Sequence, residues 1–209
     1  MRLRNVKDAK DIVSNSKYVI NNPQEYKGSF SKLFNNSNPI SLEIGMGKGD
    51  FIINMAIKYP DINFIGLEKY QSIIVRATQK LENLNLNNLK LICMDAKELN
   101  EVFAKEIDTI YLNFSDPWPK QRHAKRRLTS DTFLPIYDSI FKKDKRIVQK
   151  TDNVGLFEYS IVSLSNYGYV IKDISLDLHN TSKENVMTEY EKKFSSQGIK
   201  INYLEAIKK

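Results

Sequence analysis

The sequence predicts an α/β fold in which a mostly parallel sheet carries helices on both faces. Short apolar runs, typical of buried strands, alternate along the chain with segments whose apolar positions recur at helical spacing. Helical segments of about 10 to 15 residues between strands are typical of parallel sheets. The chain has 209 residues, of which 41% are hydrophobic, so it can form one domain with a real core and is short for two.

The first 38 residues differ from the rest of the chain. Residues 1–38 are polar and rich in asparagine, and they show no strong periodicity. We expect them to form an N-terminal arm or lid. The alternating pattern starts at Pro39, so residues 39–209 are predicted to be a single folded domain.

The strands and helices of the first half can be assigned in order. Apolar runs predict strands over residues 40–44, 63–68, 89–94 and 107–114. A helix is expected after Gly49 and ends at Pro60, because proline cannot continue a helix. One helical stripe runs over residues 73–84, and a short helix is expected near residues 97–105.

The pattern resumes after a polar, basic segment. A helix is predicted over residues 131–141 with Pro135 in its first turn, where proline is tolerated. The later elements are predicted to be a strand over residues 146–150, a helix over 156–165 and two strands over 169–178 and 199–207.

Charge and composition exclude several classes of protein. The formal net charge of +7 favours a polyanionic partner. One cysteine and two histidines cannot form an intramolecular disulfide or a Cys/His zinc cluster, and no metal is expected. The charged N-terminus lacks the apolar core of a signal peptide, and no apolar run reaches the roughly 18 residues that a membrane span needs. We therefore expect a cytoplasmic protein without a membrane partner.

A glycine-rich turn joins the first predicted strand to its helix. Its residues are Glu43-Ile44-Gly45-Met46-Gly47-Lys48-Gly49. Glycines accept positive φ and carry no side chain, so a ligand can approach the backbone closely. The carboxylate of Glu43 at the entrance disfavours a pyrophosphate, the usual guest of such turns, and suits a ligand with cationic groups. S-adenosylmethionine carries an ammonium and a sulfonium, so the turn favours it over a nicotinamide dinucleotide.

Two acidic residues stand at the ends of the next two predicted strands. Glu68 follows the glycines by about 20 residues, where an acid can accept hydrogen bonds from both ribose hydroxyls of an adenosine. Asp95 ends the third strand, where an acid can accept from the exocyclic amine of an adenine. Since the carboxyl ends of parallel strands meet at one edge, Glu43, Glu68 and Asp95 together predict a site for an adenosyl ligand.

A stiff, basic segment from Asn113 to Thr129 begins at the end of the fourth strand. Pro117 and Pro119 stiffen its start, and the one tryptophan of the chain, Trp118, lies between them. The indole can stack on a base or pin the loop to the core, and the sequence leaves both open. Residues 120–127 hold five lysines and arginines and no acid, which predicts contact with RNA phosphates.

The segment from Asn113 to Thr129 resembles the signature of the bacterial tRNA (guanine-N7-)-methyltransferase family. Other blocks that agree with that family are Glu43 to Gly49, Glu68, Asp95, Thr151-Asp152-Asn153 and Thr188-Glu189-Tyr190-Glu191. The resemblance implies a Rossmann-like class I methyltransferase fold with a seven-stranded sheet, S-adenosyl-L-methionine as cofactor and tRNA as partner. The substrate that it implies is a guanine of the tRNA variable loop, at tRNA position 46, methylated at N7.

The resemblance also implies roles for individual residues. Those expected to bind the cofactor are Glu43, Gly45, Gly47, Gly49, Glu68, Asp95 and Asp116. Asp116 is in addition the expected catalytic residue. Those expected to bind the substrate are Lys120, Asp152, Thr188, Glu189, Tyr190 and Glu191. Those expected to contact the RNA are Arg122, His123, Lys125, Arg126 and Arg127.

The chemistry of guanine N7 fits a site that has acids but no metal. N7 has an in-plane lone pair and carries no proton in the neutral base, so it can attack a sulfonium methyl group without a general base. The protein then has to strip water from N7, aim it at the methyl group and stabilise the positive charge that arrives on the purine. Asp116 can hold the guanine edge, stabilise that charge or place the cofactor, and the sequence leaves these roles open.

Other interpretations stay open at this point. The order Asn-Phe-Ser-Asp-Pro-Trp-Pro from residue 113 faintly resembles the motif of methyltransferases that modify exocyclic amines. A non-catalytic RNA-binding protein could keep the same fold. A nicotinamide-dependent dehydrogenase is disfavoured by Glu43 in the glycine-rich turn. The sequence also leaves open whether the protein is a monomer or a homodimer.

Overall fold

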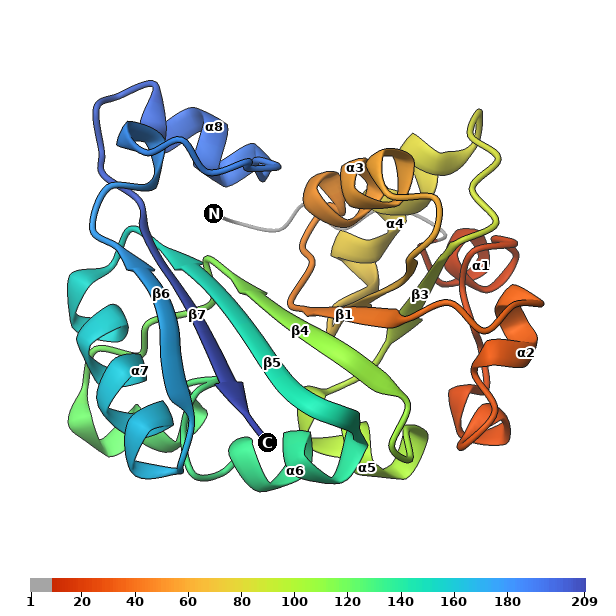
Figure 1. Cartoon of the computed structure of the whole chain (residues 1–209). Coiled ribbons are helices and arrows are strands. Elements are labelled where there is room, and N and C mark those ends of the chain that lie inside the picture. The colour runs from red at the N-terminus through yellow and green to blue at the C-terminus, as the bar shows by residue number, and fades with distance from the viewer. Residues whose placement is uncertain (1–8) are drawn as a thin grey trace.

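A seven-stranded sheet forms the centre of the computed structural model, which describes residues 9–209 (Figure 1). Its strands are β1 (Ile40–Ile44), β2 (Asn63–Glu68), β3 (Leu89–Cys93), β4 (Ile107–Asn113), β5 (Phe141–Thr151), β6 (Val170–Ser175) and β7 (Asn202–Lys208). The order across the sheet is β3-β2-β1-β4-β5-β7-β6. Neighbours from β3 to β5 pair in parallel, and β7 is antiparallel to both β5 and β6. The predicted Rossmann-like, mostly parallel sheet is confirmed.

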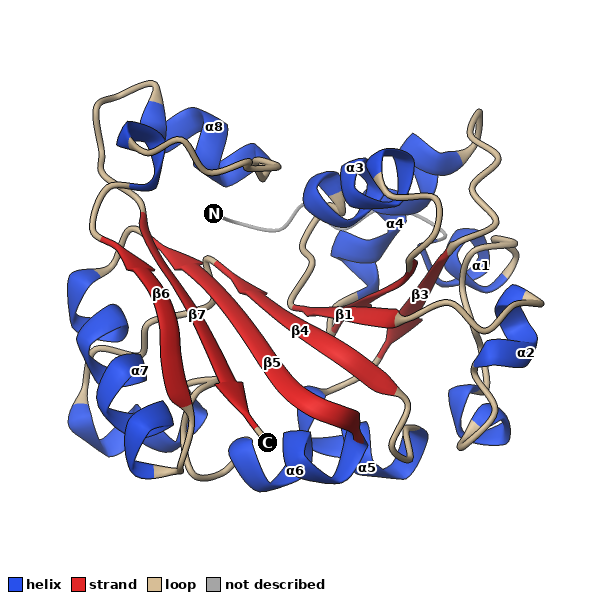
Figure 2. Cartoon of the chain, viewed as in Figure 1, coloured by secondary structure: helices blue, strands red, loops and turns tan. Residues whose placement is uncertain are grey.

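Helices cover both faces of the sheet (Figure 2). One face packs against α5 (Leu99–Val102), α6 (Leu134–Ile140) and α7 (Val154–Asn166). The other packs against α3 (Asp50–Lys58) and α4 (Gln71–Leu81). The remaining helices are α1 (Ala9–Ser14), α2 (Ser31–Phe34), α8 (Glu189–Ser195) and the 3-10 helices η1 (Pro23–Tyr26), η2 (Ala96–Glu98), η3 (Gln121–Arg126) and η4 (Leu178–Asn180). Within residues 9–209, every helix is too short or too polar to cross a lipid bilayer.

The central strands explain why the sequence pattern is so clear there. Every residue of β1 and of β2 is buried, because helices cover both faces of the sheet, and apart from Ser41, Glu43, Asn63 and Glu68 these residues are apolar or glycine. Both begin and end as predicted. Between them, Gly49 begins α3 with a left-handed φ of 80°, and a Cβ there would lie 2.9 Å from Cβ of Ala77. The glycine therefore lets α3 and α4 pack closely.

Some boundaries differ from the prediction for physical reasons. α6 begins at Leu134 rather than at residue 131, with Pro135 in its first turn as expected. β5 begins at Phe141, five residues earlier than the predicted 146, because its first charged residues are exposed and make no apolar run. α8 was not predicted, although Thr188 and Glu191 form a capping box, and that spacing is a sequence signature of a helix start.

The N-terminal segment packs along the β3 edge of the sheet. Val19 forms a parallel bridge with Leu91, and the backbone N–H of Ile20 donates to the Leu91 carbonyl at 2.9 Å. Phe30 is fully buried and belongs to the same core as β1 and β4. The boundary at residue 38 stays a prediction, and residues 1–8 of the predicted arm lie outside the described residues.

Candidate functional site

The carboxyl edge of the parallel strands gathers the predicted cofactor residues. Glu43 lies near the end of β1 and pairs in register with Gly66 of β2 and Tyr111 of β4. Glu68 ends β2, and Asp95 follows β3 by two residues. Because these strands are neighbours and run in one direction, their acids come to one edge of the sheet. In Figure 1, α3 and α8 both lie above this edge.

Glu43 is buried, and only one of its two carboxylate oxygens has a hydrogen-bond partner within the described residues. Its side chain is 2% exposed, and Oε1 accepts a hydrogen bond from Nδ2 of Asn113 at 2.9 Å. Oε2 of Glu43 and Oδ1 of Asn113 are buried without a hydrogen-bond partner in the described part of the chain. Burial raises the pKa of Glu43 to about 7, although the Asn113 hydrogen bond and the Lys150 charge oppose the rise. Two unsatisfied acceptors side by side suit a cationic donor such as an ammonium group.

The glycine-rich turn leaves open space above its backbone. Gly45 and Gly47 have φ values of 77° and 57°, and a Cβ at either position would meet no atom within 4 Å. The N–H of Gly47 donates to Oε2 of Glu68 at 3.1 Å, which ties the turn to the end of β2. The turn is thus held in place yet uncovered, as a ligand that lies against the backbone requires.

Glu68 and Asp95 differ in how they are held. Glu68 is buried and accepts from the N–H groups of Gly47 and Tyr70. Burial raises the pKa of Glu68, those backbone hydrogen bonds oppose the rise, and the charge of Asp116 adds to it, so Asp116 lies within electrostatic range. Burial also raises the pKa of Asp95, but an ion pair with Lys69 at 2.8 Å and the Lys97 N–H outweigh it, and the pKa is lowered.

The loop after β4 is stiff and braced from inside. Phe114 and Trp118 adopt left-handed backbone conformations, with φ of 50° and 42°. Arg127 is buried, and its guanidinium donates to the carbonyls of Pro117 and Trp118, each at 3.1 Å. The same guanidinium lies 4.3 Å above the Tyr159 ring. The predicted RNA-binding residue Arg127 therefore contacts its own loop in this structure, and its contact with RNA stays a prediction.

The tryptophan of this loop packs against the basic run. The Trp118 ring meets the His123 ring edge-on at 5.8 Å, and the Arg126 guanidinium lies 4.8 Å from its centre. Of the two open roles for the indole, pinning the loop is the one that these contacts support. The exposed cations of the run are Lys120, Arg122, Lys125 and Arg126, and none of them forms an ion pair with an acid within residues 9–209.

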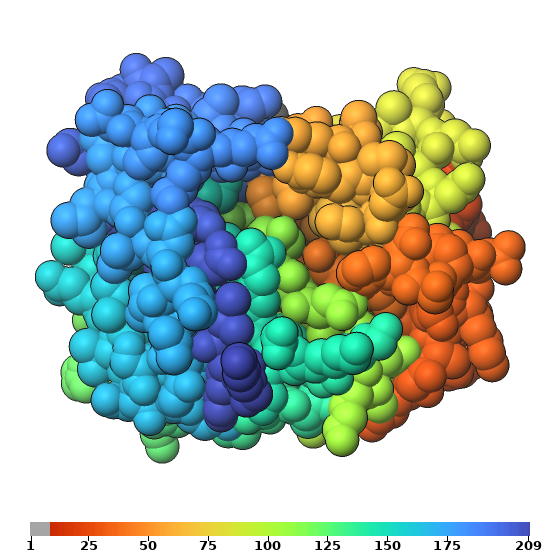
Figure 3. All heavy atoms as spheres, viewed as in Figure 1, coloured from red at the N-terminus to blue at the C-terminus, as the bar shows by residue number. Residues whose placement is uncertain are grey.

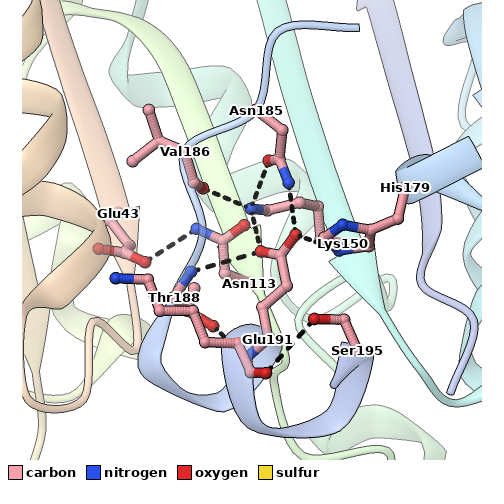
Figure 4. Close-up of polar contacts among 10 residues, drawn as sticks. Glu43, Asn113, Lys150, His179, Asn185, Val186, Thr188, Glu191 and Ser195 are labelled. Carbon is pink, nitrogen blue, oxygen red and sulfur yellow. Dashed lines mark hydrogen bonds and ion pairs between the residues drawn. The ribbon is translucent and has the colours of Figure 1, made fainter. Parts of the chain in front are cut away.

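The block from Thr188 to Glu191 starts α8, and its residues point in two directions. Glu191 is fully buried and pairs with Nζ of Lys150 at 2.6 Å and with Nε2 of His179 at 3.1 Å (Figure 4). Thr188 accepts from the Glu191 N–H in the capping box. Glu189, by contrast, is exposed and pairs with Lys48 of the glycine-rich turn at 2.8 Å. The block thus reaches both the sheet and the cofactor side of the site.

Tyr190 presents an aromatic surface beside the loop after β4. Its side chain is 42% exposed, although its ring stacks on Phe194 at 4.0 Å and lies 5.0 Å from the Phe114 ring. Its hydroxyl donates to Oδ2 of Asp152 at 3.4 Å. The structure therefore brings three of the predicted substrate residues, Asp152, Glu189 and Tyr190, to the same side of the sheet as the glycine-rich turn.

The segment before α8 contacts the end of α3. Tyr59, which follows α3, donates to Oε2 of Glu184 at 3.0 Å, and Lys58 pairs with the same carboxylate. In Figure 3, atoms of the C-terminal part of the chain (blue) meet those of the α3 region (orange) on this face of the molecule.

Sequence reasoning missed the polar groups beneath α8. Lys150, Asn185 and His179 received no role, yet all contact Glu191. One signal was available for Lys150, because it follows the apolar pair Ile147-Val148 in the buried half of β5, where a lysine needs a buried partner. Asn113 was part of the matched segment, and only the structure shows that it bonds Glu43.

Comparisons with known proteins agree with this geometry. A family model described as "Putative methyltransferase" matches residues 37–204. A tRNA (guanine-N(7)-)-methyltransferase of Bacillus cytotoxicus is 54% identical over 209 residues, which cover 99% of this chain and 96% of that protein. One of Lachnoclostridium phytofermentans is 46% identical and covers 100% and 99%. A crystal structure of the 16S rRNA methyltransferase KamB superposes with a TM-score of 0.66 at 14% identity, covers 86% and 92%, and shows the fold alone.

Proposed function

The chain belongs to the tRNA (guanine-N(7)-)-methyltransferase family, and we propose that it transfers the methyl group of S-adenosyl-L-methionine to N7 of a guanine in tRNA. The observation that carries the proposal is the meeting of an unsatisfied buried acid, an open glycine-rich turn and an exposed cationic loop at one sheet edge. The finer proposal is that the guanine is position 46 of the variable loop and that the reaction takes place in the cytoplasm, where tRNA is found.

The residues at the carboxyl edge fit this cofactor. When bound, S-adenosyl-L-methionine supplies an electrophilic methyl group on a positively charged sulfur. Glu43 and Asn113 offer two buried acceptors without partners, which suit its ammonium group. Gly45 and Gly47 would let it lie against the turn, whereas Gly49 faces Ala77 and would serve the site by starting α3. Glu68 and Asp95 would accept from its adenosine.

The protein's task in the reaction is placement and charge stabilisation. Guanine N7 needs no deprotonation before it attacks, so the site needs no general base. Asp116 lies on the stiff loop, exposed, and within electrostatic range of Glu68. We assign it the catalytic role, in which its carboxylate is available to hold the guanine edge or to stabilise the positive charge that develops on the purine.

The guanine would be bound between the loop after β4 and the start of α8. Tyr190 offers an exposed ring for stacking, Asp152 and Glu189 offer carboxylates for the N1–H and N2 amine of the base, and Lys120 lies on the loop. Arg122, His123, Lys125 and Arg126 would follow the RNA backbone, with Arg127 bracing the loop beneath them.

One assay tests the proposal. The protein is incubated with labelled S-adenosyl-L-methionine and unmodified tRNA, and the digested nucleosides are separated. We expect the label in 7-methylguanosine, and we expect it to be lost when guanine 46 of the tRNA is replaced by adenine. Label in a base with a methylated exocyclic amine would support the amine-methyltransferase alternative. Cofactor and tRNA binding without any transfer would support a non-catalytic RNA-binding protein.

A further inference from the structure

Lys150 gives its whole hydrogen-bonding capacity to one segment of the chain. It lies near the end of β5, and its side chain is 4% exposed. Its ammonium group contacts Oε2 of Glu191 at 2.6 Å, the Val186 carbonyl at 2.8 Å and Oδ1 of Asn185 at 3.1 Å (Figure 4). An ammonium has three hydrogens to donate, so all are used between residues 185 and 191.

The Glu191 carboxylate is equally occupied. Oε2 accepts from Lys150 and from the Thr188 N–H at 3.3 Å. Oε1 accepts from Nδ2 of Asn185 at 2.5 Å and lies 3.1 Å from Nε2 of His179. A carboxylate with these contacts and no exposed surface has nothing to offer a base from solution. Glu191 therefore acts inside the protein, where its N–H donates to the Thr188 hydroxyl oxygen.

These contacts hold the two residues of the block that do face outward. Glu189 reaches Lys48 of the glycine-rich turn, and Tyr190 lies between Phe194 and Phe114 with its hydroxyl on Asp152. Glu189 and Tyr190 lie between Thr188 and Glu191, the two residues of the capping box, and Lys150 holds Glu191 in place. A shift of the start of α8 would move the Tyr190 ring away from the loop that carries Asp116.

We propose that Lys150 is a positioning residue for the tRNA guanine: its ion pair with Glu191 holds residues 185–191 on β5 so that Glu189 and Tyr190 face the base. The proposal rests on the proposed function. A buried ion pair contributes little net stability compared with apolar groups of the same volume. We infer that this pair instead fixes the position of residues 185–191 on β5, because its directional contacts allow only one arrangement. The charge of Lys150 also lowers the pKa of Glu43, so the test below removes Lys150 and Glu191 together, which leaves the net charge near Glu43 unaltered.

The test replaces the ion pair without leaving a buried charge. Lys150→Met alone would strand Glu191, so the variant is Lys150→Met combined with Glu191→Leu. We expect the affinity for S-adenosyl-L-methionine, measured by calorimetry, to stay within about twofold. We expect kcat/KM for tRNA to fall on the order of 10²-fold, because small misplacements of reacting groups have effects of that size. Lys183→Met is the matched control, since Lys183 lies two residues before the segment 185–191 and forms a partly exposed ion pair with Asp173 of β6. Its kcat/KM should stay near that of the wild-type protein.

Two results would overturn the proposal. A stable double variant with unchanged kcat/KM would show that the pair only fills space. A loss of cofactor affinity as large as the loss of tRNA activity would show that Lys150 acts on the cofactor side. If the double variant does not fold, Asn185→Ala decides, because it removes two hydrogen bonds, one to Lys150 and one to Glu191, and keeps the ion pair. A smaller loss of the same kind supports the proposal, and unchanged kcat/KM overturns it.

Hydrogen exchange separates this proposal from the proposed function. The backbone N–H groups of residues 191 and 192, which both donate to Thr188, should lose protection in the double variant and keep it in Lys183→Met, whatever the enzyme methylates. Unchanged exchange at these amides would overturn the positioning role. If the wild-type protein forms no 7-methylguanosine, the proposed function is overturned. The exchange result would still decide whether Lys150 positions residues 185–191.

Discussion

The side-chain amide of Asn113, at the end of β4, donates a 2.9 Å hydrogen bond to Oε1 of Glu43 on β1, and Oε2 of the same carboxylate is buried without a partner in the described residues. A buried acceptor that is left unsatisfied costs stability, so such a group calls for a functional reason. A cationic ligand at the glycine-rich turn provides one. We therefore propose that Glu43 links folding, cofactor binding and pH.

The stability of the ligand-free protein should depend on pH through Glu43. Burial raises its pKa from 4.5 to about 7, so the folded protein holds a proton that the unfolded chain has already released. This contribution to the free energy of unfolding is fully present below about pH 4.5, is on the order of 3 kcal/mol, and is lost as the pH rises through about 7. Urea unfolding should show that the wild-type protein loses more free energy of unfolding between pH 5 and pH 8 than Glu43→Gln does. An equal difference between the two proteins at both pH values would contradict the raised pKa.

Cofactor affinity should change with pH in the opposite direction. Below pH 7 Glu43 is increasingly protonated, so the attraction to a cationic ligand weakens, by up to about tenfold per pH unit. Glu43→Gln should weaken binding of S-adenosyl-L-methionine by about 10- to 100-fold at pH 7.5, as expected for loss of a charged hydrogen bond, and should flatten the pH dependence. Calorimetric titrations between about pH 6 and 7.5 measure both effects. Glu82→Gln, on an exposed helix end, is the control and should bind normally.

Asp116→Ala should reduce turnover by orders of magnitude while the protein stays folded. The residue is exposed on a loop that Arg127 braces independently, so its removal leaves the core intact. The initial rate of 7-methylguanosine formation and the thermal unfolding midpoint should be measured on the same preparation. Turnover close to that of the unchanged protein would remove Asp116 from the mechanism.

Arg126→Ala should weaken tRNA binding in a salt-dependent way. Arg126 is exposed and packs on Trp118 without an ion pair among residues 9–209, so its charge is available to a phosphate. Loss of one phosphate contact should reduce the slope of log affinity against log salt concentration by about one unit. Filter binding or fluorescence titration over a range of salt concentrations measures the slope. The same slope in both proteins would count against this contact.

Arg127→Ala should behave differently from its neighbour. Its guanidinium is buried, and its loss leaves the Pro117 and Trp118 carbonyls without their donor, at a cost of about 1 to 3 kcal/mol. The thermal midpoint should fall clearly, whereas Arg126→Ala should leave it almost unchanged. A normal midpoint for Arg127→Ala together with a reduced salt slope would instead support direct RNA contact by Arg127.

The sequence predicted the parts of the fold whose signals are local. β1 and β2 were assigned residue for residue, because a strand buried on both faces is rich in apolar residues and each of these two ends at a clear turn. The glycine-rich turn and the acids after the next strands were found for a related reason: consecutive parallel strands end at the same edge. The start of β5 was missed because its first residues are charged and exposed. The helix α8 was also missed, although its capping box spans only four consecutive residues, Thr188 to Glu191.

The sequence alone determined that an α/β domain carries an acid-lined, glycine-rich turn and a stiff cationic loop, since composition and spacing along the chain encode both. Only the tertiary structure decided that Asn113 satisfies half of Glu43, that Arg127 turns inward while Arg126 stays exposed, and that Lys150 pairs with Glu191 beneath α8. The physical reason is distance along the chain. These partners come together through the order of strands and the packing of loops, and a hydrogen bond is set by the atoms within about 3 Å rather than by neighbours in sequence.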